Sequence, residues 1–83
     1  MEMEYVLILH YLNGHGVARW CTKGFCQSPK EMAEYLKENL DELCLDLKDP
    51  YDYYSIERRV GMYDRHDICD GELEDLIKIM QNL

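Results

Sequence analysis

The sequence predicts a small α+β domain with the element order ββαβα. An apolar run rich in Tyr, Val and Ile precedes Asn-Gly-His-Gly at residues 13–16, which is typical of a β-hairpin. Apolar residues recur at helical spacing over 32–47 and again over 73–83, and an alternating segment at 53–63 separates them. We therefore expect one domain over residues 1–83, with a three-stranded antiparallel sheet in the order 2-1-3 and two helices on one face.

The first strand is predicted at residues 5–12, where both alternating faces are apolar, as in a central strand. After the turn, residues 17–25 form the return strand. A right-handed crossover brings the third strand in parallel to the second, so placing the first strand between them makes every neighbouring pair antiparallel. The face without helices is expected to carry Tyr, Trp or Leu side chains in the open.

The first helix is predicted to start at Ser28-Pro29, because serine caps helices and proline suits the first turn. Glu31 lies where a capping box places its second acceptor. Pro50 ends the helix by residue 49, since the residue before proline resists the helical conformation. The pattern leaves Leu45 opposite the apolar stripe, so either the helix frays before it or its side chain is exposed. The stripe comprises Met32, Leu36, Leu40, Leu43 and Leu47.

The third strand is predicted at residues 53–63, with Arg58 as the one interruption of its alternation. The last helix is expected to follow Asp70, a plausible cap, with acidic residues in its first turn. Its apolar stripe comprises Leu73, Leu76, Ile77, Met80 and Leu83.

The charge is strongly negative and uneven. The net charge is −8; residues 1–30 hold two acids and three bases, whereas residues 31–83 hold fifteen acids and six bases. Phosphate backbones need a basic footprint, so direct nucleic-acid binding is disfavoured and a basic protein partner is favoured. The acidic start of the chain differs from a secretory signal, and no apolar run approaches the ~20 residues of a membrane helix. We expect a cytoplasmic, soluble protein that does not bind membranes.

Two groups of residues are candidates for binding such a partner. The first is a ridge of acids on the first helix that continues into the following loop, although an ordinary solvated face explains it as well. The second is a tyrosine cluster at the start of the third strand, because tyrosine is enriched in interface hot spots. The acids are Glu34, Glu38, Asp41, Glu42, Asp46, Asp49 and Asp52, and the tyrosines are Tyr51, Tyr53 and Tyr54.

Catalysis and cofactor binding have little support in the sequence. No nucleophile elbow, Gly-rich phosphate loop or calcium-loop spacing is present, so we expect no enzymatic activity and no cofactor. The sharper alternative is a structural zinc site, for which three thiolates and an imidazole are chemically suitable. Its ligands would be Cys21, Cys26, His66 and Cys69.

The leading hypothesis is therefore a non-enzymatic acidic module that binds a basic protein surface. Its most concrete version is an inhibitor of a nucleic-acid-processing protein, of the anti-defence kind that viruses and mobile elements encode; this version is an analogy of size and charge. The alternatives are a structural domain that forms a homodimer through its sheet face or edge strand, and a zinc-clipped domain.

Overall fold

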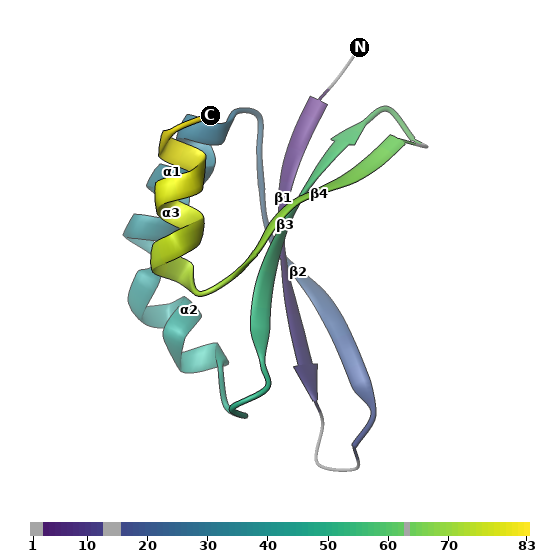
Figure 1. The fold of residues 1–83 in the computed structure, drawn as a ribbon, viewed down its shortest axis with the longest axis vertical. Coiled ribbons are helices and arrows are strands. Elements are labelled where there is room, and N and C mark those ends of the chain that lie inside the picture. The colour runs from purple at the N-terminus through teal and green to yellow at the C-terminus, as the bar shows by residue number, and fades with distance from the viewer. Residues whose placement is uncertain (1–2, 13–15, 63) are drawn as a thin grey trace.

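The computed structural model describes residues 3–12, 16–62 and 64–83, and it has two layers. An antiparallel sheet forms one layer and three helices cover one of its faces (Figure 1). The predicted α+β class and antiparallel sheet are confirmed, whereas the numbers of three strands and two helices are wrong. The elements in chain order are β1 (Met3–Leu12), β2 (Ala18–Cys26), α1 (Pro29–Glu38), α2 (Leu40–Asp46), β3 (Tyr53–Val60), β4 (Asp64–Gly71) and α3 (Leu73–Gln81).

The strand order is β2-β1-β3-β4, so the predicted order 2-1-3 is confirmed and a fourth strand extends it. β1 is central, as its two apolar faces predicted: Val6 and Leu7 point to opposite faces and both are 0% exposed. Most of the hairpin turn predicted at residues 13–16 lies outside the described residues. Figure 1 shows the β1–β2 and β3–β4 hairpins extending beyond the helices at opposite ends of the molecule.

β4 is the element that the sequence did not predict. The predicted third strand overran the real one, because β3 ends at Val60 and Gly61, with φ of +67°, lies in the turn that follows. Asp70 is in β4, opposite Ser55, so its predicted role as a helix cap is wrong. The residue at the cap of α3 is Glu72, and its side chain makes no capping hydrogen bond. Tyr63, at the end of the predicted strand, lies outside the described residues.

The long helix predicted after Ser28 is interrupted at Asn39. The Asn39 side-chain amide donates to the carbonyl oxygen of Tyr35 over 2.9 Å, and the Asn39 backbone leaves the helical region at φ −111° and ψ 16°. A second, shorter helix, α2, then runs to Asp46. Leu45 is 76% exposed on it, which is the second of the two outcomes that its position predicted.

The start of α1 agrees with the predicted capping signal. The Glu31 backbone N–H donates to the Ser28 hydroxyl over 3.1 Å, and Pro29 occupies the first turn. The Glu31 carboxylate in turn accepts from the backbone N–H of Gln27, one residue before the cap. These bonds fix the N-terminal end of the helix that carries part of the predicted acidic ridge.

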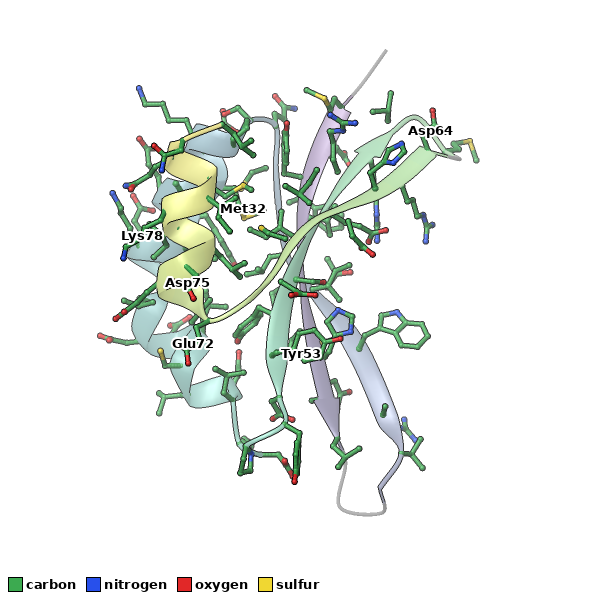
Figure 2. The ribbon with its side chains drawn as sticks, in the orientation of Figure 1. Met32, Tyr53, Asp64, Glu72, Asp75 and Lys78 are labelled. Carbon is green, nitrogen blue, oxygen red and sulfur yellow. The ribbon has the colours of Figure 1, made fainter. Side chains whose placement is uncertain are left out.

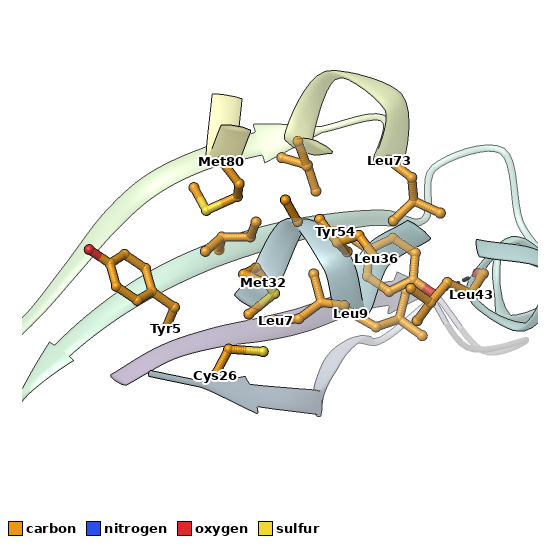
Figure 3. Close-up of a cluster of buried hydrophobic side chains, with 13 residues drawn as sticks. Tyr5, Leu7, Leu9, Cys26, Met32, Leu36, Leu43, Tyr54, Leu73 and Met80 are labelled. Atoms are coloured by element: carbon orange, nitrogen blue, oxygen red, sulfur yellow. Dashed lines mark hydrogen bonds between the residues drawn. The ribbon is translucent and has the colours of Figure 1, made fainter. Parts of the chain in front are cut away.

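The core lies between the helices and the sheet (Figure 3). Leu7 of β1, Met32 and Leu36 of α1, Ile56 of β3 and Leu76 of α3 are all 0% exposed. Each such side chain contributes about 1.5–3 kcal/mol of burial free energy, so these positions fix the arrangement of the two layers. Leu83, the last residue of the predicted stripe on α3, is exposed and takes no part in the core.

Candidate protein-binding surfaces

The acidic face comprises Glu34 and Glu38 of α1 and Asp41 and Glu42 of α2, all of which are exposed. Among the described residues only two ion pairs form, Lys23–Asp46 and Arg59–Glu57, so none of these four carboxylates is paired. The break at Asn39 divides the ridge between two short helices, although both stand in the same layer (Figure 1). The acidic face therefore presents free negative charge on elements that are anchored in the core.

The three acids that follow have structural partners. The Asp46 carboxylate pairs with the Lys23 ammonium over 3.1 Å. The Asp52 carboxylate accepts from the backbone N–H groups of Leu12, Lys48 and Asp49, at 3.0–3.1 Å. Asp49 accepts from the backbone N–H of Tyr51 over 3.0 Å. These carboxylates hold the loop between α2 and β3 in place, and they still carry negative charge at this end of the molecule.

The three predicted tyrosines have different surroundings. Tyr51, in the loop, is 79% exposed, and Tyr53, at the start of β3, is 43% exposed. Tyr54 is 0% exposed and its hydroxyl donates to the carbonyl oxygen of Leu43 over 2.6 Å. Burial raises the pKa of Tyr54, so its phenol stays neutral. Its predicted role in partner binding is therefore wrong, because its side chain belongs to the core.

The sheet face away from the helices carries the exposed aromatic side chains that the sequence predicted in general terms. Val6 and Ile8 of β1 form a buried floor on this face, at 0% and 6% exposed. Phe25 lies opposite Val6 and is 60% exposed, and Trp20, on the same strand, is 72% exposed. Large apolar patches on a small protein mark interaction surfaces more often than chance.

An aromatic groove lies at one end of this open face. His10 of β1 stands between Trp20 of β2 and Tyr53 of β3, each directly opposite it in the register. The rings of His10 and Tyr53 stack with centroids 4.6 Å apart and planes 7° apart. Tyr51 also lines this groove, which has a volume of about 200 Å³. Both tyrosines were predicted from the sequence as binding residues, whereas Trp20 and His10 were not. The signal for His10 was its place on β1 next to Leu9, because neighbouring residues of a strand point to opposite faces.

His10 also contacts Ser55, a pair that resembles a base and its nucleophile. Its Nε2 lies 2.8 Å from the Ser55 hydroxyl, but Ser55 is only 7% exposed and does not line the groove. Within the described part of the chain no carboxylate is hydrogen-bonded to the other ring nitrogen. A catalytic serine needs both an oriented base and access to its substrate. The pair orients the His10 ring and lacks these features of a hydrolase.

The four residues of the alternative zinc site are not brought together. Cys21 and Cys26 are on β2 and His66 and Cys69 are on β4, at opposite edges of the sheet. Three strand spacings separate the edges, roughly 14 Å. Burial raises the pKa of the Cys69 thiol to about 11 and also raises that of Cys26. Over residues 3–12, 16–62 and 64–83, no group of three His, Cys, Asp or Glu side chains is placed to hold a metal ion.

A second, larger cleft of about 520 Å³ lies on the helix side of the same end. Leu9, Tyr11 and Cys21 form its apolar floor, and the Lys23–Asp46 ion pair lies in its wall. The bond to Asp46 raises the pKa of Lys23, so this amine stays protonated and is not a nucleophile. The lining of the cleft therefore combines apolar side chains with charges of both signs.

Both edge strands carry a β-bulge. In β2, Lys23 is an extra residue between Thr22 and Gly24, which face Ile8 and Leu7 of β1. In β4, Ile68 is extra in the same way against β3. Bulges twist an edge and disfavour the addition of a further strand.

None of the described helices has the length and apolar character to cross a membrane. Comparison with known proteins found no matching family model, and no curated protein or solved structure that is significantly similar to this chain.

Proposed function

We propose that this chain is a non-enzymatic protein-binding module that contacts a basic protein surface through its acidic face. The observation that carries the proposal is a set of four exposed carboxylates on helices packed against the core, none of which forms an ion pair with a residue that the structure describes. They are Glu34, Glu38, Asp41 and Glu42. Free carboxylates on a fixed scaffold attract cationic side chains without first breaking an internal ion pair.

The charge around these residues supports a basic partner. The segment from Pro29 to Asp46 holds six acids and two bases, within a chain whose net charge is −8. Such a field steers a positively charged protein toward this surface and repels nucleic acid. In the most specific form of the proposal, the partner is a nucleic-acid-processing protein and the carboxylates occupy its phosphate-binding surface, so that the module acts as an inhibitor.

A charge reversal tests the proposal. The triple variant Glu34→Lys, Glu38→Lys, Asp41→Lys should weaken binding of a short Arg-Gly repeat peptide roughly 10- to 100-fold, because each rim charge contributes up to about 1 kcal/mol. Isothermal titration calorimetry measures the affinity, and circular dichroism checks that the variant folds.

The matched control reverses three exposed acids of β4, Asp64, Asp67 and Asp70, which changes the net charge by the same amount. Figure 2 shows Asp64 at the far end of the β3–β4 hairpin, away from the helices. We expect the control to bind the peptide within a few-fold of the native protein. Equal losses in both variants would mean that only overall charge matters, and no loss in either would refute the proposal.

A homodimer formed through the open sheet face is the second candidate. The exposed side chains of Trp20 and Phe25 favour it, since a second copy would cover them. The bulges in β2 and β4 disfavour the version in which edge strands pair.

A further inference from the structure

The aromatic groove has exposed walls, and one of its rings, Tyr53, is held in a fixed position. Trp20, Tyr51 and Tyr53 are 72%, 79% and 43% exposed. The Tyr53 ring is fixed by its stacking on His10, whose Nε2 is in turn fixed by the Ser55 hydroxyl at 2.8 Å. A ring that is already ordered loses little conformational entropy when a ligand arrives, so the Tyr53 wall of the groove is preorganised for a stacking partner.

Negative charge lies beside these rings. The Asp52 carboxylate accepts from the backbone N–H of Leu12 at 3.1 Å, and Asp49 accepts from that of Tyr51 at 3.0 Å; Leu12 and Tyr51 both line the groove. Desolvation acts against the charged form of Asp52, but three backbone hydrogen bonds outweigh it and lower its pKa. Both carboxylates line the neighbouring cleft of about 520 Å³ and not the groove itself. They place negative charge at the same end of the molecule as the electron-rich ring faces, and this combination favours a cation.

The size of the groove selects the kind of cation. At about 200 Å³ it is smaller than the ~300–1,000 Å³ of pockets for drug-sized ligands, so it suits a single side chain. A guanidinium is planar, weakly hydrated and stacks on indole and phenol rings, whereas an ammonium is compact and strongly hydrated. We propose that the groove between Trp20, Tyr51 and Tyr53 binds an arginine side chain of the basic partner.

This inference deepens the proposed function and rests on it, because it names the residue type that a basic partner inserts. One groove residue opposes the arginine: Arg19 is the charged side chain in the lining, and it is exposed at the rim. Its guanidinium repels a cationic ligand and would attract an anionic one. Removal of the Arg19 guanidinium should therefore strengthen the binding of a cationic ligand and weaken the binding of an anionic one.

The test uses Trp20, the single tryptophan of the chain, as a fluorescent reporter. The Arg-Gly repeat peptide should change the Trp20 emission in a saturable way, and a Lys-Gly peptide of the same length should bind more weakly. Trp20→Leu should weaken the Arg-Gly peptide about 3- to 30-fold by calorimetry, the range expected for a cation–π contact. Arg19→Ala should strengthen it.

Other results would overturn the inference in separable ways. Peptide binding that leaves the Trp20 emission unchanged and tolerates Trp20→Leu would refute the arginine site and keep the acidic-face proposal. Single-stranded oligothymidylate tests the alternative of an anionic ligand. If it changes the Trp20 emission, and binds more weakly to Arg19→Ala than to the native protein, the groove would be assigned to a stacked anionic ligand. Emission that varies with protein concentration alone would assign it to a second copy. Failure of every basic peptide to bind would refute the proposed function itself.

Discussion

At the scale of single residues, Gly24 shows how closely the helix layer approaches the sheet. A Cβ atom at this position would lie 2.7 Å from Cζ of the Tyr35 ring, which is shorter than a van der Waals contact. The Tyr35 hydroxyl donates to the carbonyl oxygen of Lys23 over 2.8 Å, so the ring cannot swing away without breaking that bond. Glycine is needed here for space between β2 and α1.

Substitution of this glycine tests that contact. Gly24→Ala should lower the free energy of unfolding by about 1–3 kcal/mol, the usual cost of overpacking, as measured by urea denaturation. In a Tyr35→Ala background the same substitution should cost much less, because the clashing ring is gone. An equal cost in both backgrounds would place the strain elsewhere.

Single residues also show the limit of what the sequence could predict about the candidate site. Tyr53 and Tyr54 are neighbours with the same side chain, yet one lines the aromatic groove and the other is buried under Leu43. Alternation puts Tyr54 on the strand face of Ile56 and Tyr53 on the face of Ser55 and Glu57. The apolar face thus marked Tyr54 for the core, and the prediction of three surface tyrosines did not use that signal. The exposed acids of α1 and α2 were predictable because helical periodicity gives both the buried and the solvent side.

At the scale of elements, the loop between α2 and β3 depends on one carboxylate. Asp52 accepts backbone hydrogen bonds from Leu12 of β1 and from Lys48 and Asp49 of the loop. It thereby ties the loop that carries Tyr51 to the end of the central strand. This connection holds Tyr51 at the end of the sheet where Trp20 also lines the aromatic groove.

The protonation of Asp52 should therefore affect stability. Its pKa is lowered in the folded protein from the ordinary 3.8, so its contribution is present above that pH and is lost as the pH falls through the lower, folded value. Asp52→Asn should be less stable than the native protein at pH 7, and the difference should shrink at the acid end of a urea-denaturation series. Asp41→Asn is the control and should show no such difference, because Asp41 is exposed and makes no side-chain hydrogen bond within residues 3–12, 16–62 and 64–83. A gap that stays constant with pH would contradict the account.

Elements with a strong periodic signal were predicted, and those that depend on distant pairing were not. The apolar faces of β1 and the stripes of the helices come from local residue order. β4 contains Asp64, Asp67 and Asp70, residues that strands usually avoid, and it forms because β3 supplies its hydrogen-bond partners. Likewise, the hydrogen bond from the Asn39 side chain to Tyr35 interrupts the helix. The leucines on both sides keep their helical spacing, so their pattern predicted one continuous helix.

At the scale of the whole molecule, the two layers present different surfaces. The helix layer carries the acidic face, and the open side of the sheet carries Trp20, Phe25 and Tyr53. The loop that bears Tyr51 and the carboxylates of Asp49 and Asp52 joins them at one end (Figure 1). A partner that covers this end would contact both negative charge and aromatic rings.

If the open sheet face binds a different protein and not a second copy of this chain, the purified chain should be a monomer. Native mass spectrometry should give a single species at the chain mass of 9.9 kDa over a range of protein concentrations. A dimer would support the second candidate function, because it would place another copy on the exposed Trp20 and Phe25. Trp20→Leu should then shift that dimer toward monomer.

A ¹H–¹⁵N NMR titration of the isotopically labelled chain with the Arg-Gly repeat peptide would locate the binding surface residue by residue. We predict saturable shifts for the backbone amides of residues 34–42 and 49–53, with the residues of β4 left unchanged. Shifts centred on β4, or none at peptide concentrations that saturate binding by calorimetry, would contradict the assignment of the acidic face as the binding surface.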